Sequence, residues 1–400
     1  MPTSSASASS ASSRISTMMR FIRFVAALWI VGMLVACGTA PVGPPMPTGP
    51  VVANPVPAPT PNGQLAPAIL QPRSRWVAVP WTDLPGFADD ALHEAWNAWL
   101  RSCERPGPAF APLCAQVRPL AIADGNAQRE WMVRNLQPYR VEPLAGATDG
   151  LLTGYYEPLL DATRQPGPGN AVPLYRPPAS LSTRRPWYSR QEIDTLPEAR
   201  AELRGREIAY LADPLDALVL QIQGSGRVRI TEADGSQRLV RLAFAGSNDQ
   251  PYRSVGNWLL QQGAIRDASW PGIKAWARQN PQRLNEMLWS NPRTVFFREE
   301  LLSDLDAGFG PRGAQGVALT PGRSIAVDRE SIPYGTPVWL ASPGPAIALQ
   351  RLVFAQDTGS AIVGAVRADY FAGWGPEAGE LAGRLKQPLQ MWVLWPRPPG

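Results

Sequence analysis

The sequence RLVFAQDTGSAIVGAVRAD, residues 351–369, contains the pattern that decides the fold. Its apolar run Arg351–Gln356 predicts a short buried strand, and Asp357 follows in a glycine-containing turn. Asp369 closes the stretch, and Asp328 likewise follows the apolar run Ser324–Val327. A single aspartate in such a place is usually a turn former that bonds its own backbone. Three such aspartates in the last quarter of the chain favour a functional site. Closely placed carboxylates repel one another, and this cost to stability is seldom retained unless the groups serve a function.

Asp357-Thr358-Gly359-Ser360 also matches the aspartic-protease signature. Such proteases need two carboxylates that share one proton, supplied by two lobes or two chains. The sequence has no second Asp-Thr-Gly, and Gly364 and Arg367 interrupt the apolar pattern that should follow. An aspartic protease is therefore a minor alternative.

Short apolar runs between glycine and proline turns predict a mainly β protein of barrel type. The Asp234-Gly235 turn predicts a hairpin, whereas Gly224-x-Gly226 alone is weak evidence for a nucleotide site. The expected strands are Ala217–Gln223, Arg227–Thr231, Gln237–Phe244, Thr294–Phe297, Gly316–Leu319, Ser324–Val327, Thr336–Leu340, Arg351–Gln356 and Leu389–Leu394. The expected helices are Asp89–Cys103, Glu130–Leu136, Ser254–Gln262 and Pro281–Ser290.

Composition excludes several kinds of chemistry. The chain of 400 residues has one histidine, His93, so a His-x-x-x-His zinc site is impossible and a Ser-His-Asp triad would need this residue. His93 lies within the first expected helix, where a surface or core role is the simpler interpretation. The net charge is +5, and three arginines before Cys37 supply most of it. The rest has no basic run, so we expect no nucleic-acid partner.

The N-terminus resembles an export signal. Arg20 and Arg23 precede the apolar run Phe24–Ala36, which is shorter than the ~20 residues of a membrane-spanning helix. The four residues ending in Cys37 resemble a bacterial lipobox, so we expect a signal peptide over 1–36 and a lipidated Cys37. An uncleaved anchor is the alternative. Gly38 stands where Asp would retain a lipoprotein in the inner membrane, which implies the outer membrane. Residues 37–72 are rich in proline and predict an extended tether.

Cys103 and Cys114 are the remaining cysteines. Exported proteins enter a compartment that oxidises thiols, so we predict a disulfide between them. Two free buried thiols are the alternative, and we expect no metal at this pair.

Five blocks of the sequence, in order, resemble the membrane-bound lytic murein transglycosylase A family. They are Gly154-Tyr155-Tyr156-Glu157-Pro158, the block Leu220–Gly226, the block Pro251–Gly256, Asn291-Pro292 with Val295-Phe296-Phe297, and Asp357 through Asp369. The last block resembles the three-aspartate domain of smaller wall-active proteins, and the resemblance covers residues 76–396. Asp249 is a departure, because the family commonly has Gly after this Asn.

The resemblance implies a double-psi β-barrel with a second β domain inserted. We expect the barrel domain over 73–158 and 294–396 and the insert over 159–293, with a glycan strand between them. The implied reaction cleaves the β-1,4 bond between N-acetylmuramic acid and N-acetylglucosamine and leaves a 1,6-anhydro end. No cofactor or metal is expected, and the implied partners are peptidoglycan glycan strands, the membrane through the lipid anchor alone, and cell-wall machinery on the periplasmic face.

One carboxylic acid is enough for such a reaction, because the C6 hydroxyl of the sugar is the nucleophile in place of water. We expect Asp369 as acid/base, as the resemblance also implies, near a groove rim after a glycine-containing excursion. We expect Asp357 to bond backbone amides, with a lowered pKa, and Asp328 to support both; the reverse assignment of Asp357 and Asp369 stays open. The expected substrate-binding residues are Tyr155, Tyr156, Glu157, Gln221, Gln223, Gly224, Ser225, Gly226 and Tyr252. A non-catalytic, expansin-like glycan-binding module is the main alternative.

Overall fold

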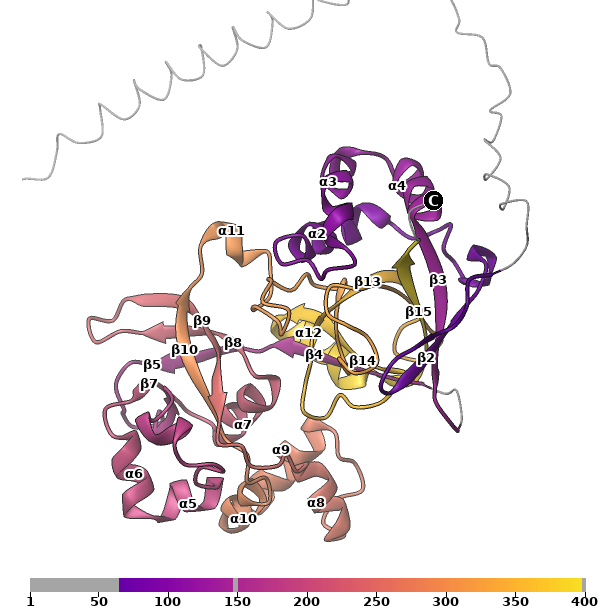
Figure 1. Cartoon of the computed structure of the whole chain (residues 1–400). Helices are drawn as coiled ribbons and strands as arrows, with labels where there is room; N and C mark the ends of the chain where they lie inside the picture. The colour runs from indigo at the N-terminus through magenta and orange to yellow at the C-terminus, as the bar shows by residue number, and fades with distance from the viewer. Residues whose placement is uncertain (1–64, 147–149, 398–400) are drawn as a thin grey trace, which may run out of the picture. The chain divides into compact units, whose positions relative to one another are not determined.

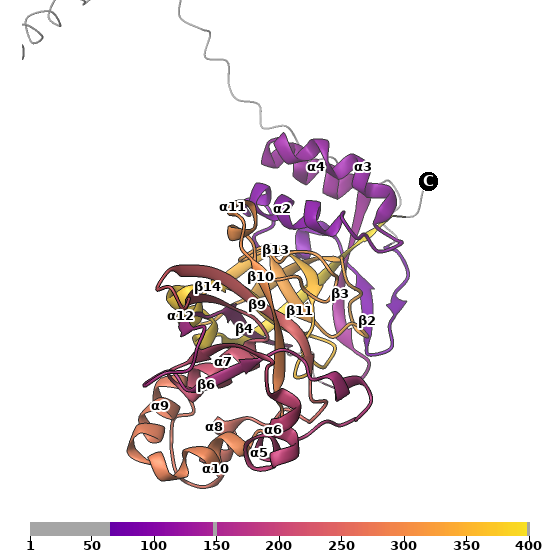
Figure 2. The same cartoon turned by 90° about the vertical axis from the view of Figure 1, so that its left-hand side faces the viewer.

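The structure, a computed structural model, describes residues 65–146 and 150–397 and is mainly β, as expected (Figures 1 and 2). The strands are β1 (Ile69–Leu70), β2 (Ser74–Ala78), β3 (Leu136–Pro143), β4 (Gly150–Glu157), β5 (Leu159–Thr163), β6 (Val172–Tyr175), β7 (Glu207–Leu211), β8 (Gly226–Thr231), β9 (Gln237–Ser247), β10 (Val295–Leu301), β11 (Ser324–Val327), β12 (Pro337–Ser342), β13 (Leu349–Asp357), β14 (Arg367–Trp374) and β15 (Lys386–Pro396). The α-helices are α2 (Leu92–Ser102), α3 (Cys114–Val117), α4 (Gly125–Asn135), α5 (Arg190–Thr195), α6 (Pro197–Leu203), α7 (Pro214–Gln223), α8 (Val255–Gln261), α9 (Trp270–Gln279), α10 (Leu284–Trp289), α11 (Asp304–Ala307) and α12 (Gly375–Arg384). Short 3-10 turns are η1 (Trp81–Asp83), η2 (Ala111–Leu113), η3 (Pro119–Ile122), η4 (Ala179–Ser182) and η5 (Pro281–Arg283).

Six strands close a barrel in the order β15-β12-β13-β11-β14-β4, and β4 pairs back onto β15. The neighbouring strands β3, β2 and β1 extend this sheet beyond β15. The barrel interior is apolar, with Trp76, Leu152, Ile325, Val353 and Val393 in one buried cluster. Burial of such side chains is the main force that stabilises the barrel.

Helices α2, α3 and α4 lie together at one end of the barrel in both views (Figures 1 and 2). Their apolar faces contribute Trp96, Trp99 and Trp131, which pack with Phe354 of β13 in a second cluster. The spacing of Trp96 and Trp99 in the sequence predicted α2 as an amphipathic helix. His93 is exposed on α2.

A second sheet has the order β10-β9-β8-β5-β7-β6. The hairpin predicted at Asp234-Gly235 is confirmed, because β8 and β9 pair in antiparallel fashion around Gly235, whose φ is 83°. Helices α5 and α6 pack around Trp187 and Phe296, and α8, α9 and α10 pack with one side of α7.

Two strand predictions are wrong. Ala217–Gln223 belongs to helix α7, which begins after Asp213, the N-cap whose side chain accepts from the N–H of Leu215, and ends at the left-handed Gly224. This helix is buried on two sides, with Leu218 in one cluster and Leu220 in another, so its apolar run shows no helical period.

Gly316–Leu319, the second wrong prediction, is a loop. Its alternating apolar residues, Val317 and Leu319, are buried, but the segment does not pair as a strand of either sheet. The expected boundary at residue 293 also assigns Val295–Leu301 to the barrel, whereas β10 pairs with β9 in the second sheet. Strand β10 therefore belongs to the second sheet, because it forms an antiparallel pair with the long strand β9.

Candidate active site

Two of the predicted aspartates lie on β13 and β14, the barrel strands on either side of β11. Ala326 of β11 is paired with Asp369 of β14 on one side and with Asp357 of β13 on the other. Thr153 of β4 pairs with Asp369 and extends the row to a fourth strand. Two strand spacings, about 10 Å, therefore separate the backbones of the two aspartates. The barrel brings together residues that lie more than 200 positions apart in the sequence.

Asp357 is half-buried at the end of β13. Its Oδ1 accepts a hydrogen bond from the N–H of Ala314 at 2.9 Å, and its Oδ2 accepts one from the hydroxyl of Tyr155 at 2.9 Å. Burial raises the pKa of Asp357 to about 6, and the negative charge of Asp369 adds to this shift, against the opposite effect of these bonds and of the Thr358 backbone. The expectation of a lowered pKa is wrong, because the loss of water outweighs the hydrogen bonds.

Asp369 is half-buried within β14, so the excursion expected before it is in part a strand. Its Oδ1 accepts a hydrogen bond from the hydroxyl of Thr153, which in turn accepts one from Nη2 of Arg367 at 2.8 Å. Burial raises the pKa of Asp369, while the Thr153 bond and the Arg367 cation oppose this shift. Both aspartates therefore hold a proton more readily than a carboxylate in water.

Thr153 is a site residue that the sequence analysis missed. It stands two residues before Tyr155 on β4, so both side chains project from the same face of the strand. Thr153 reaches Asp369, and Tyr155 reaches Asp357. The two-residue spacing between Thr153 and Tyr155 was the sequence signal that could have indicated Thr153 as a site residue.

Asp328 is buried and holds two loops together. Its Oδ1 accepts from the N–H of Glu330 at 3.0 Å, and its Oδ2 accepts from the N–H of Gly364 at 2.9 Å. Nε of Arg73 lies 3.3 Å from the same Oδ2. These are the contacts of a residue that shapes the loops next to β11.

Glu157 is fully buried and joins the two sheets. Its carboxylate is bound by Arg241, with Nε 2.8 Å from Oε1, and by Arg227, with Nε 3.3 Å from Oε2. Both arginines also donate to the carbonyl oxygen of Phe309, and the Arg227 guanidinium stacks over the ring of Trp374 at 3.6 Å. A carboxylate enclosed in this way stabilises the junction between the two sheets, and its expected binding role stays a prediction.

Several other predicted binding residues build the junction between α7, β8 and β4. Gln223 Oε1 accepts from the N–H of Tyr156 at 3.0 Å, and Gln221 Oε1 accepts from Nη2 of Arg190 at 2.7 Å. Ser225 is buried, and a Cβ at Gly226 would lie 2.4 Å from the Leu220 side chain. The close approach of helix and strand thus requires glycine here.

Tyr156 and Tyr252 lie in different surroundings. The ring of Tyr156 packs against α12, where a Cβ at Gly379 would lie 2.8 Å from it. Tyr252 is 37% exposed in the segment before α8. Of the two, Tyr252 presents the more accessible aromatic face.

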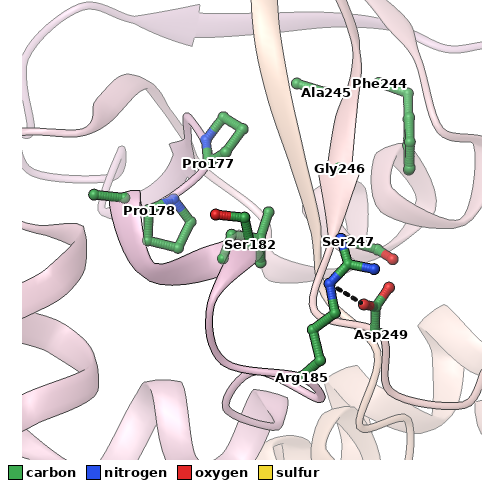
Figure 3. A pocket seen from close by; sticks show the side chains of 11 residues that line it. Pro177, Pro178, Ser182, Arg185, Phe244, Ala245, Gly246, Ser247 and Asp249 are labelled. Atoms are coloured by element: carbon green, nitrogen blue, oxygen red, sulfur yellow. Dashed lines mark ion pairs between the residues drawn. The ribbon is translucent and has the colours of Figure 1, made fainter.

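A separate pocket of about 430 Å³ lies on the second sheet (Figure 3). Arg185 and Asp249 form an ion pair in it, with Nε 3.5 Å from Oδ2. Asp249 has φ +55°, a conformation that favours glycine, which accounts for the glycine commonly found there in the family it resembles. The pocket is lined by Pro177, Pro178, Ala179, Leu181, Ser182, Arg185, Phe244, Ala245, Gly246, Ser247 and Asp249, none of which is a predicted site residue.

The cysteines of the chain lie partly inside and partly outside the described residues. Cys103 and Cys114 form a disulfide bond between the end of α2 and the start of α3. The signal peptide over 1–36 and Cys37 lie outside the described residues, as does most of the tether. Over the ranges 65–146 and 150–397, we find no helix with the length and apolar character needed to cross a membrane. The same ranges contain no group of three or more His, Cys, Asp or Glu residues arranged to hold a metal ion.

Comparisons with known proteins match two stretches of the chain to two family descriptions. Residues 151–298 match the MltA specific insert domain, and residues 323–395 match the 3D domain. Membrane-bound lytic murein transglycosylase A of Escherichia coli K12 is 32% identical over 291 residues, which cover 67% of this chain and 74% of that protein. The Vibrio cholerae protein of the same name is 30% identical over 254 residues, which span 61% of this chain and 65% of the relative's length.

Solved structures give the same result. The lytic transglycosylase LtgG of Burkholderia pseudomallei is 42% identical with a TM-score of 0.57, and the match covers 85% of this chain and 99% of that one. MltA of Neisseria gonorrhoeae is 30% identical with a TM-score of 0.70, covering 84% and 96%. The barrel, the second sheet and these similarities together define a protein of the lytic transglycosylase class. The chain belongs to the membrane-bound lytic murein transglycosylase A family.

Proposed function

We propose that this protein cleaves the β-1,4 bond between N-acetylmuramic acid and N-acetylglucosamine in peptidoglycan, with Asp369 as the acid/base. The observation that carries the proposal is the pair of half-buried carboxylates, Asp357 and Asp369, on the two strands beside β11. Their raised pKa values suit a site in which one carboxyl group must hold a proton near neutral pH.

In the proposed reaction, Asp369 donates its proton to the glycosidic oxygen as the bond from that oxygen to C1 breaks. The C6 hydroxyl oxygen of the same muramic acid residue then bonds to C1, and its proton passes to the Asp369 carboxylate. The products are a 1,6-anhydro end and a free 4-hydroxyl, and no water is consumed. The carboxyl group ends in its starting protonation state.

Asp357 is assigned the role of the charged neighbour. A negative charge near Asp369 disfavours a second one, so an ionised Asp357 helps Asp369 to remain protonated. Tyr155 and Ala314 donate hydrogen bonds to Asp357, which favour its charged form. The division of roles thus rests on which carboxyl group receives more donors.

The test is incubation with purified sacculi, followed by mass spectrometry of the soluble products. We expect anhydro-muropeptides from the wild type, and none from Asp369→Asn with sacculus binding retained. Asp304→Asn, in α11, is the matched control and should behave as the wild type. Binding by the wild type without any product would support the expansin-like module, and hydrolysed reducing ends would overturn the transglycosylase mechanism. An active Asp369→Asn beside a folded, inactive Asp357→Asn would reverse the two roles.

We further propose that the protein is a lipoprotein held on the periplasmic face of the outer membrane through Cys37. The lipobox-like residues before Cys37 and the proline-rich segment after it support this location. The described part of the chain then works on the wall at the end of a tether.

A further inference from the structure

A buried hydrogen-bond network connects the end of α2 with the residue that precedes Asp357. Gln356 is fully buried, and its Nε2 donates to the carbonyl oxygen of Ala98 and to Oγ of Ser102, both at 2.8 Å. The hydroxyl of Ser324 donates to its Oε1. Every polar atom of this buried side chain therefore has a partner, which fixes the end of β13 against α2.

Gln315 connects the same helix end to a loop that crosses β13. Its Nε2 donates to the carbonyl oxygens of Ser102 and Arg105, at 3.3 and 3.1 Å, and its Oε1 accepts from the Ser102 hydroxyl at 3.3 Å. Its backbone N–H donates to the carbonyl oxygen of Gln356 at 3.0 Å. One side chain thus ties the loop to the helix while its backbone ties the loop to the strand.

The loop carries one of the donors to Asp357. Ala314, the neighbour of Gln315, donates its N–H to Oδ1 of Asp357 at 2.9 Å. Gly313 allows the close approach, because a Cβ there would lie 2.4 Å from the carbonyl oxygen of Gln356. The position of the Ala314 N–H therefore depends on how residues 313–315 are anchored.

We propose that Gln315 is a positioning residue that keeps the Ala314 N–H on the Asp357 carboxylate. The proposal rests on the role given above to an ionised Asp357. Gln315 does not itself touch Asp357; it acts through the backbone of its neighbour. Loss of its anchor lets the loop move and leaves Asp357 with the Tyr155 hydroxyl and the Thr358 backbone as its donors.

The predicted consequence concerns the pH dependence of the reaction. A hydrogen bond to the charged form of a carboxyl group lowers its pKa, so loss of the Ala314 donor raises the pKa of Asp357. The acidic limb of the pH–rate profile, where Asp357 must be ionised, then moves to higher pH. Binding of the glycan strand does not involve this bond, so KM stays near its wild-type value.

The decisive variant is Gln315→Glu, which keeps the length of the side chain and turns its donor into an oxygen that faces two carbonyl oxygens. We expect kcat to fall by about ten- to a hundredfold, as small displacements in active sites do. KM should stay within about twofold, and the acidic limb should shift upward. Gln237→Glu, the same change at an exposed position at the start of β9, is the control and should leave all three unchanged.

Wild-type kcat and an unmoved acidic limb in folded Gln315→Glu would overturn the proposal. A lower kcat with an unmoved limb would also overturn it, because that result indicates a structural role alone. If Gln315→Glu does not fold, Ser102→Ala, which removes the hydroxyl shared by Gln315 and Gln356, is judged by the same criteria. A wild type that releases no anhydro product would refute the proposed function itself, and that outcome is distinct from these.

Discussion

At the scale of single residues, Asp357 combines two opposing demands. The proposed reaction needs it ionised beside Asp369, whereas its burial favours the neutral form and raises its pKa to about 6. Such tension is common at active sites, which hold groups in surroundings that do not suit them for folding alone. It makes the stability of this protein depend on pH in a predictable direction.

We predict that Asp357→Asn is more stable than the wild type at pH 8 and inactive. Between the pKa of the unfolded chain, about 4, and the folded value of about 6, the native state binds more protons than the unfolded one. The contribution of Asp357 to the free energy of unfolding is therefore present at low pH and is lost as the pH rises through 6. This loss is at most about 3 kcal/mol. Urea unfolding at pH 4, 6 and 8 measures it. A variant that is less stable than the wild type at pH 8 would contradict the dominance of burial.

Tyr155 gives a second prediction at this scale. Tyr155→Phe removes the hydroxyl that donates to Asp357 and keeps the ring, which packs against Phe371 with centroids 5.2 Å apart. Hydrogen bonds to charged groups contribute about 1.5–3 kcal/mol, so we expect kcat to fall about ten- to a hundredfold. The acidic limb of the pH–rate profile should move upward. Tyr334→Phe is the control, and an unchanged profile in Tyr155→Phe would show that its hydroxyl does not matter.

At the scale of elements, the junction between the two sheets depends on a buried charge cluster. Glu157 at the end of β4 neutralises Arg227 of β8 and Arg241 of β9. The side chains of both arginines are at most 7% exposed, so removal of the carboxylate leaves two buried cations without a counter-charge. Breaking a buried pair in this way costs about 3–5 kcal/mol.

We therefore predict that Glu157→Ala loses about 3–5 kcal/mol of unfolding free energy in urea. Glu142→Ala is a matched control: this buried carboxylate binds Arg75 and Arg140, whose side chains are 52% and 51% exposed. The guanidinium groups of Arg75 and Arg140 can be solvated when the carboxylate is removed, so the loss of the ion pairs should cost only about 1 kcal/mol. Equal losses in the two variants would refute the argument from burial of the cations.

The same elements show what sequence reasoning could and could not reach. The strand that ends at Asp357 was predicted because β13 has an apolar run followed directly by a turn. Helix α7 was missed because it is buried on two sides and its period is hidden, although Asp213-Pro214 and Gly224 marked its two ends. The Thr153–Asp369 contact was missed because it joins residues 216 positions apart, and no local pattern encodes such a pairing.

At the scale of the whole molecule, the proposed outer-membrane location rests on the N-terminal segment. We predict that labelled palmitate enters the wild type and that Cys37→Ala is released as a soluble or unprocessed form. Multiple acyl chains are needed for firm anchoring, since each buried methylene contributes about 0.8 kcal/mol. Cell fractionation and label counting measure both. Cys103→Ala with Cys114→Ala is the control, and incorporation of label into Cys37→Ala would refute the lipid anchor.

The closure of the barrel also sets an order on biosynthesis. Strand β15 pairs with both β12 and β4, so the ring cannot close until residues 386–396 have been made. The second sheet, whose strands run from 159 to 301, is complete long before that point and can fold earlier, as domains generally do during synthesis. A nascent or truncated chain thus carries Thr153, Asp357 and Asp369 on strands that have no finished scaffold. The active site is therefore complete only when the last strand has been made, which protects a growing cell from half-made copies of an enzyme that opens its wall.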